Sequence, residues 1–144
     1  MVHDDTIQLL RECDAGVRMG ITSIQEVLES VKATELRTEL QSSLEKHQAL
    51  EEEIRELLHG YHDEGKEPNA MAKGMSWVKT NMALAMDGSD GTVSDLITDG
   101  CNMGVKSLSK YLNQYQAADE TSKDIAKRLI SLEENLGVQI RRFL

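Results

Sequence analysis

The sequence predicts an all-α protein, a single domain over residues 1–144 that folds as an antiparallel up-down-up-down bundle of four helices. Three observations indicate this class. Apolar residues recur at alternating steps of three and four along most of the chain, as they do on the buried face of a helix. No stretch alternates apolar and polar residues in the way a half-buried strand does. The chain has one proline and no long Ser/Gly tract, so no linker divides it into two cores.

The first two helices are expected to form a hairpin. One runs over about Thr6–Val31, with Asp5 as its N-cap and Gln8 in the capping-box position. The other runs over about Thr34–Leu58, and the short connection between them favours antiparallel neighbours. Their apolar stripes consist of Leu10, Cys13, Val17, Ile21, Ile24, Leu28 and Val31 in the first helix, and of Leu36, Leu40, Leu44, His47, Leu50, Ile54, Leu57 and Leu58 in the second.

The third helix is expected to be broken near residues 87–91. Pro68 is suited to the first turn of a helix, which then covers about Asn69–Met86 and stops at the sequence Asp-Gly-Ser-Asp-Gly. The helix restarts at Thr92, whose hydroxyl can cap it, and ends near Gln116. The last helix starts at Thr121 by the same capping pattern.

Charge and composition exclude several partners. The chain has 16 Lys and Arg against 25 Asp and Glu, a net charge of -9 that repels phosphate backbones and anionic lipid head groups. Its five aromatic residues are too few for a base-stacking platform. The longest apolar run, Met82–Met86, is far shorter than the ~20 residues of a membrane-spanning helix. We therefore expect no nucleic acid and no membrane as a partner, and the lack of a secretory signal favours a cytoplasmic location.

Several short motifs resemble those of a known family. The interrupted third helix, the segment Gly74–Lys79 (GMSWVK) and the pair Asp99-Gly100 followed by Tyr111 are similar to features of uncharacterised bacterial proteins of the ferritin-like superfamily. This resemblance implies a ferritin-like four-helix bundle. In that branch a glutamate usually follows the glycine, whereas Cys101 follows Gly100 here.

A dimetal site of the ferritin-like kind has a strict sequence requirement. It takes a Glu-x-x-His pair from each of two helices and one Glu from each of the other two. Only one histidine has a glutamate three positions before it, in the pair Glu56 and His59, and no histidine follows His62. That pair lies at a helix end beside Gly60 rather than in the middle of the bundle. We therefore expect no stoichiometric dimetal centre.

His47 takes the place of a leucine in the apolar stripe of the second helix, with Glu51 one turn on. In the favoured interpretation the imidazole lies at the edge of the core and is satisfied by a hydrogen bond to Glu51. The alternative is a reduced site for one iron, manganese or zinc ion. Its ligands are His47 and Glu51, Glu12 or Asp14 from the first helix, and Glu133 from the last.

The two cysteines, Cys13 and Cys101, are too few for a disulfide scaffold. In an up-down-up-down bundle they lie at similar heights, but on helices that are diagonal neighbours, and a disulfide needs Cα atoms within about 7 Å. Neither has a basic neighbour that would lower the pKa of its thiol. We favour small hydrophobic residues of the core, with a thiol-based sensor as the alternative.

Two pairs of glycines, Gly16 with Gly20 and Gly100 with Gly104, lie within predicted helices. Glycine lowers helix propensity, so its presence calls for a reason. The spacing predicts a close approach of helix backbones and leaves open a cavity beside them.

The segment before the break carries two apolar faces. Its methionines fall at helical spacing, while Trp77 and Leu84 project about 140° away from them at ~100° per residue. One helix of a four-helix bundle rarely buries two such faces within its own chain. We therefore expect a two-fold homodimer, with core packing of the methionines as the alternative. The expected interface comprises Met71, Met75, Trp77, Met82 and Leu84.

Three classes of function remain. The leading expectation is a non-catalytic ferritin-like bundle that acts through self-association or a protein partner. A metal-binding ferritin-like protein and a thiol-based sensor are the alternatives. No nucleophile with an adjacent base can be identified, so nothing in the sequence argues for an enzyme.

Overall fold

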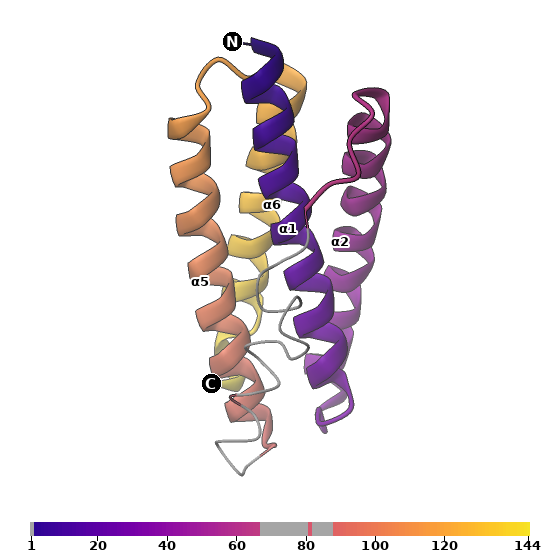
Figure 1. Cartoon of the computed structure of the whole chain (residues 1–144). Helices are drawn as coiled ribbons and strands as arrows, with labels where there is room; N and C mark the ends of the chain where they lie inside the picture. The colour runs from indigo at the N-terminus through magenta and orange to yellow at the C-terminus, as the bar shows by residue number, and fades with distance from the viewer. Residues whose placement is uncertain (1, 67–80, 82–87) are drawn as a thin grey trace.

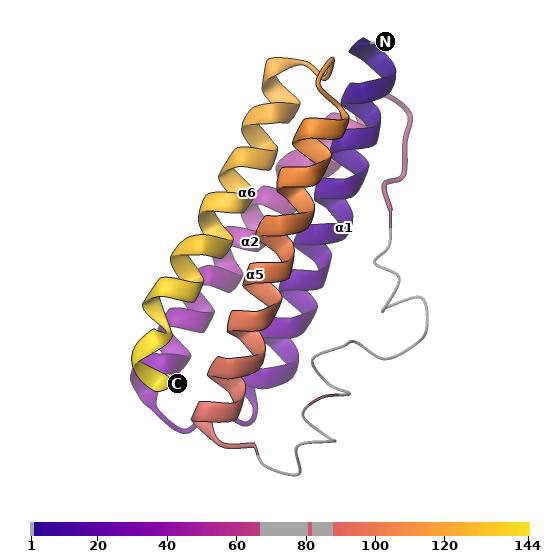
Figure 2. The same cartoon turned by 90° about the vertical axis from the view of Figure 1, so that its left-hand side faces the viewer.

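Four long helices form one bundle in the computed structural model, which describes residues 2–66, 81 and 88–144 (Figure 1). Figure 2 shows the same helices packed side by side along most of their length. The all-α class is confirmed, because no strand occurs in the described ranges. The helices are α1 (Val2–Leu28), α2 (Thr34–Gly60), α5 (Asp90–Gln114) and α6 (Glu120–Gln139), followed by the 3-10 turn η1 (Arg141–Phe143).

Hydrogen bonds at the two ends of the bundle show how the helices run. At one end, the Asp5 carboxylate near the start of α1 accepts from the backbone amide of Ala117 in the α5–α6 turn. At the other, the Asp90 carboxylate at the start of α5 accepts from the amides of Lys32 and Ala33, just before α2. The starts of α2 and α5 therefore lie at the same end, and these two helices run in the same direction (Figure 1).

The predicted up-down-up-down order is consequently wrong. Each hairpin, α1 with α2 and α5 with α6, is antiparallel, but the end of α2 and the start of α5 lie at opposite ends of the bundle. Helix α2 has 27 residues and is about 40 Å long at ~1.5 Å per residue, a span that residues 61–89 can easily cover. The sequence interpretation treated Asn69–Met86 and the helix from Thr92 as one interrupted helix, which would run antiparallel to α2.

Helix α5 begins earlier than the predicted Thr92. Ser89 is its N-cap, with its side-chain oxygen accepting from the backbone amide of Thr92 at 3.2 Å, and Asp90 is already helical. Serine is among the strongest N-caps, and this hydrogen bond places the start of α5 at Asp90. Apart from Asn81, the predicted helix Asn69–Met86 lies outside the described residues.

Helices α6 and α1 also begin earlier than their predicted N-caps indicate. Helix α6 begins one residue before the predicted Thr121, because the Asp119 side chain accepts from the amide of Ser122 at 2.8 Å. Helix α1 begins at Val2, so Asp5 lies within the helix rather than capping it. The Asp5 carboxylate instead accepts a hydrogen bond from the Ala117 amide and so links the α5–α6 turn to α1.

The buried apolar side chains form two clusters, one toward each end of the bundle. The cluster at the end where α1 begins includes Leu50 of α2 and Leu129 of α6, and the other cluster includes Leu40 and Leu136 of the same helices. His47 and Glu133 lie between these positions in both helices and are themselves buried. A polar layer therefore interrupts the core in mid-bundle.

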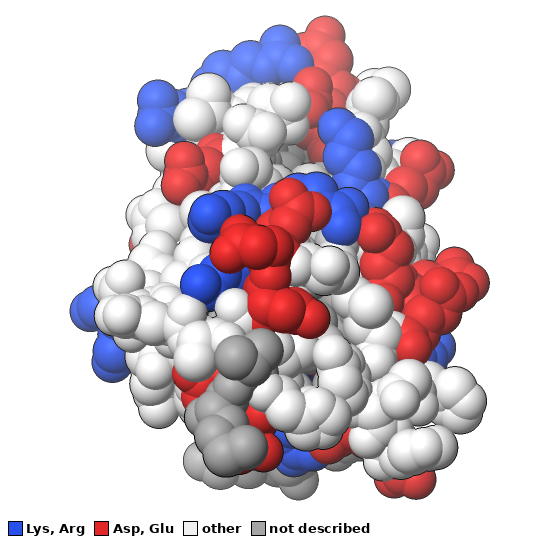
Figure 3. Space-filling model, turned by 90° about the horizontal axis from the view of Figure 1, so that it is seen from above, with Lys and Arg blue, Asp and Glu red and all other residues white. Residues whose placement is uncertain are grey.

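The outer surface carries charge of both signs. Figure 3 looks down on the end of the bundle where α1 begins, and acidic and basic side chains are interspersed there. In the part of the chain that the structure describes, no helix combines the length and apolarity needed to cross a membrane.

Candidate functional site

A buried imidazole and a buried carboxyl group meet in the polar layer. His47 of α2 is 0 % exposed and Glu133 of α6 is 7 % exposed. Nε2 of His47 lies 2.9 Å from Oε1 of Glu133, and Nδ1 lies 2.7 Å from the backbone carbonyl oxygen of Ser43. The pair thus links α2 to α6 through the centre of the bundle.

These contacts determine the charge of the pair. A carbonyl oxygen can only accept, so Nδ1 of His47 carries a proton and donates it to Ser43. The contact between Nε2 and Glu133 Oε1 needs one further proton, held by one atom or the other. Imidazolium with carboxylate and imidazole with carboxylic acid both have zero net charge. The pair is therefore neutral as a unit in either arrangement.

Cys101 of α5 joins this pair through its thiol. The thiol hydrogen-bonds to Glu133, and burial, followed by the charge and hydrogen bond of Glu133, raises the pKa of Cys101 well above its usual range. The thiol is therefore protonated at neutral pH and donates to the carboxyl group. Glu133 thus receives hydrogen bonds or shared protons from two other helices.

Glycines of α1 and α5 border the polar layer, and the one in α1 makes room for the imidazole. A Cβ atom built on Gly20 of α1 would lie 2.7 Å from Cδ2 and 2.8 Å from Nε2 of His47. A Cβ on Gly104 of α5 would lie 3.6 Å from Cδ of Glu133, an ordinary contact. Gly20 therefore makes room for an imidazole ring and not, as the sequence predicted, for the backbone of another helix.

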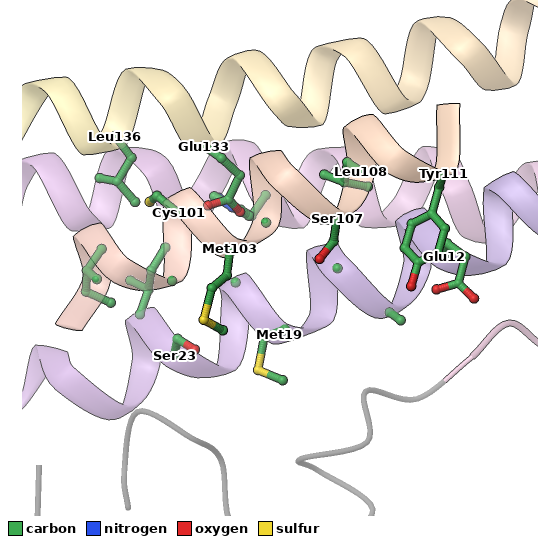
Figure 4. Close-up of a pocket in the computed structure, with 18 of the residues that line it drawn as sticks. Glu12, Met19, Ser23, Cys101, Met103, Ser107, Leu108, Tyr111, Glu133 and Leu136 are labelled. Atoms are coloured by element: carbon green, nitrogen blue, oxygen red, sulfur yellow. The ribbon is translucent and has the colours of Figure 1, made fainter. Parts of the chain in front are cut away.

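A cavity of about 340 Å³ lies between α1 and α5 beside this polar layer. Among its lining residues, Gly100, Gly104, Ser107 and Tyr111 share one face of α5 because they are spaced by three or four. Figure 4 shows Met103 and Ser107 extending from α5 toward α1, with Cys101 and Glu133 behind them. The lining from α1 includes Gly16, Met19, Gly20 and Ser23. His47 and Glu133 are thus the polar floor of a mainly apolar space.

One end of the cavity is closed by a second polar group of residues. The Lys66 ammonium lies 2.5 Å from Oε1 of Glu12, and Tyr111 hydrogen-bonds to the same carboxylate (Figure 4). Burial, then the charge and hydrogen bond of Glu12, raises the pKa of Tyr111, so its phenol keeps the proton at neutral pH. The hydrogen bond that Lys66 donates to Glu12 raises the pKa of Lys66. Glu12 and Lys66 therefore compensate each other's charge.

The structure brings together two of the four residues predicted as metal ligands. His47 and Glu133 meet, whereas Glu12 pairs with Lys66 and Glu51 pairs with Arg55. Within residues 2–66, 81 and 88–144, no group of three or more His, Cys, Asp or Glu side chains is arranged to hold a metal ion. The four-residue set is therefore not assembled as a site in this conformation.

The favoured partner of His47 was also wrong. The imidazole lies in the core, where it contacts Ser43 on its own helix and Glu133 across the bundle, while Glu51 pairs with Arg55 at 3.5 Å. Side chains of an α-helix lean toward its N-terminus, so the ring reaches the preceding turn rather than the following one.

The two cysteines lie in different apolar clusters, Cys13 toward the start of α1 and Cys101 in the other cluster. They were expected at similar heights on parallel helices, but α1 and α5 run in opposite directions. Burial, and then Glu12 and Asp14, raises the pKa of Cys13 to about 12. Both thiols are free and buried, as core residues are.

The predicted dimer interface lies outside the described residues. This set comprises Met71, Met75, Trp77, Met82 and Leu84. Sequence reasoning missed the contact of Cys101 with Glu133 and the role of Gly20 beside His47. The sequence signal for the role of Gly20 was a glycine and a polar residue, each on an otherwise apolar helix face.

Comparisons with known families, curated proteins and solved structures find no match for this chain.

Proposed function

We propose that the protein is a non-catalytic helical bundle that binds a small organic molecule in the cavity between α1 and α5. The observation that carries this proposal is the cavity itself, about 340 Å³ in volume, with mainly apolar walls and a few polar groups at its floor and end. This combination is the usual composition of a small-molecule site. Neither thiol in the described residues is a ready nucleophile, because both are buried and protonated.

The ferritin-like assignment is part of the proposal. Ferritin-like bundles consist of two antiparallel helix hairpins joined by one long stretch of chain. In this protein, residues 61–89 separate the two hairpins. In those bundles, cofactor and ligand sites are built in the core from side chains on facing helices. His47 and Glu133 occupy such a position.

Filling the cavity tests ligand binding directly. A Cβ on Gly100 meets no described atom within 4 Å, so Gly100→Leu places an isobutyl group in the cavity without an initial clash. Gly60→Leu is the matched control, since Gly60 also has open space around its Cβ position but lies at the exposed end of α2. Binding of small ring compounds such as indole and 2-naphthol is measured by saturation-transfer NMR.

We expect at least one of these compounds to bind to the wild type and to Gly60→Leu with equal affinity, and to lose at least tenfold in affinity for Gly100→Leu. Two results contradict the proposal: binding that Gly100→Leu leaves unchanged, and no binding of any compound at millimolar concentration to the wild-type protein.

A reduced metal site for iron, manganese or zinc is the second candidate, favoured by the meeting of His47 and Glu133. Glu12 and Glu51 would have to leave Lys66 and Arg55 to complete it. Elemental analysis after aerobic purification tests it: one metal ion per chain, lost in His47→Ala, supports this function. Metal-free protein that still binds the ring compounds favours the organic ligand.

Self-association through a homodimer, or binding of a protein partner, stays a proposal from the sequence. It rests on the two apolar faces of the segment before the break, one formed by the methionines and the other by Trp77 and Leu84. A cytoplasmic location and the absence of nucleic-acid binding are likewise predictions from charge and composition.

A further inference from the structure

We infer that the molecule bound in this cavity is neutral at physiological pH, mainly apolar, and carries a hydrogen-bond donor that contacts Glu133. Suitable classes are phenols, alcohols and N–H heterocycles with one or two rings. This inference rests on the proposed ligand-binding function and adds the chemistry of the ligand.

Neutrality follows from the charges that line the cavity. The His47–Glu133 pair has zero net charge whichever group holds the shared proton, because Nδ1 of His47 must donate to the Ser43 carbonyl oxygen. At the end of the cavity, Lys66 compensates Glu12. An ionic ligand would therefore lack a partner of opposite charge while its own charge lost hydration, which is costly in an apolar site.

The donor follows from the hydrogen-bonding capacity of Glu133. A carboxyl group has about four acceptor positions when ionised, and Nε2 of His47 and the thiol of Cys101 account for two contacts. With the shared proton on either His47 or Glu133, the group keeps acceptor positions that Cys101 and His47 do not use. Glu133 lines the cavity, so these positions are within reach of a ligand.

The volume sets the size of the ligand. An engineered apolar cavity of about 150 Å³ holds benzene, so a cavity of about 340 Å³ has room for roughly a dozen non-hydrogen atoms. Apolar side chains of Ile24, Leu96, Ile97, Leu108 and Leu136 contribute to the lining and suit a ring system. Two fused rings with one small substituent fit this space.

The test uses four naphthalene probes of nearly equal size. They are 2-naphthol, a neutral donor; 2-fluoronaphthalene, which has no donor; 2-naphthoate, an anion; and 2-naphthylmethylammonium, a cation. Affinities are measured by titration calorimetry at pH 7 with the full chain. A hydrogen bond to Glu133 should make 2-naphthol bind roughly 10- to 100-fold more tightly than 2-fluoronaphthalene.

Two variants locate the contact. Glu133→Leu removes the acceptor and should bring the two affinities within about threefold of each other. Glu45→Leu makes the same chemical change at an exposed position of α2 outside the cavity and should preserve the ratio. Circular dichroism checks that each variant is folded. Should Glu133→Leu fail to fold, the four affinities of the wild-type protein still decide the matter.

The outcomes separate this inference from the proposed function. Equal binding of 2-naphthol and 2-fluoronaphthalene, lost in Gly100→Leu, overturns the donor and leaves ligand binding standing. Tighter binding of 2-naphthoate or 2-naphthylmethylammonium than of 2-naphthol overturns neutrality. Failure of all four probes to bind contradicts the proposed function, and the inference falls with it.

Discussion

Adding a single methyl group should distinguish Gly20, which is packed against His47, from a glycine whose Cβ position has no neighbour among the described residues. Gly20 and Gly100 both lie inside helices and both line the cavity. A Cβ at Gly20 would approach Cδ2 of His47 to 2.7 Å, whereas a Cβ at Gly100 meets no described atom within 4 Å. Gly20→Ala and Gly100→Ala are therefore a matched pair with the same chemical change and opposite expected effects.

The magnitudes follow from three contributions. Alanine gains about 1 kcal/mol over glycine in helix propensity at either position. At Gly20 the His47 ring must retreat by about 0.8 Å to restore a normal carbon–carbon distance of about 3.5 Å. This stretches the 2.9 Å contact with Glu133, and a buried hydrogen bond left unmade costs about 1–3 kcal/mol. Overpacking adds a similar ~1–3 kcal/mol. The net loss at Gly20 is then about 1–5 kcal/mol, against a gain of up to ~1 kcal/mol at Gly100.

Urea denaturation followed by circular dichroism measures both variants. The midpoint should fall for Gly20→Ala and rise for Gly100→Ala, with unchanged m-values. In a His47→Ala background the ring is absent, so Gly20→Ala should become neutral or stabilising, a coupling that a double-mutant cycle reports. The reasoning is refuted if Gly20→Ala is as stable as Gly100→Ala, or if removal of the ring leaves its effect unchanged.

Three further predictions concern the ends of the bundle, a buried thiol and the oligomeric state. Asp90→Ala should lower the free energy of unfolding by about 1–2 kcal/mol, because it removes the acceptor for two amides before α2, while the exposed Asp95→Ala should change it by less than about 0.5 kcal/mol. Folding raises the pKa of Cys13 from 9.0 to about 12, so the stabilising contribution of the protonated thiol is complete below pH 9 and is lost as the pH rises toward 12. The free energy of unfolding should therefore fall with pH over that window, and Cys13→Ala should make this slope shallower by about 1.4 kcal/mol per pH unit. An unchanged slope in Cys13→Ala would disprove the burial of the thiol. Light scattering behind size exclusion should give a dimer mass that Trp77→Ala reduces to 16.1 kDa, whereas a monomeric wild type at tens of micromolar would refute self-association.

The helices themselves were predictable because burial imposes a period of 3.6 on the sequence. The stripes from Leu10 to Ile24 and from Leu36 to Leu58 follow α1 and α2 closely, and most of their members are buried. The direction of α5 relative to α2 was not predictable in this way. A local pattern specifies which face of a helix is buried, but a connection as long as residues 61–89 allows either direction.

The site was predictable only where one residue breaks a pattern. His47 stood out because it replaces an apolar residue in a stripe, and Glu133 was named with it. Their contact depends on which helices are neighbours across the bundle, so the sequence pointed instead to Glu51, one turn away on the same helix. Cap positions were misplaced for a related reason: Ser89 and Thr92 are both competent caps, and the tertiary contact of Asp90 with the α1–α2 turn favours the earlier one.

The glycines in the middle of the bundle have two different physical explanations, and the difference bears on function. Two helices contribute large polar side chains to the layer of His47 and Glu133, and Gly20 compensates for that volume on α1. Gly20 is thus explained by packing. Gly100 has no neighbour among the described residues within 4 Å of its Cβ position, so alanine there should stabilise the helix by about 1 kcal/mol. Packing against the described residues therefore does not account for Gly100. Under the proposed ligand-binding function, a bound molecule fills the cavity that Gly100 lines, and the energy given up in the empty protein is regained from the ligand.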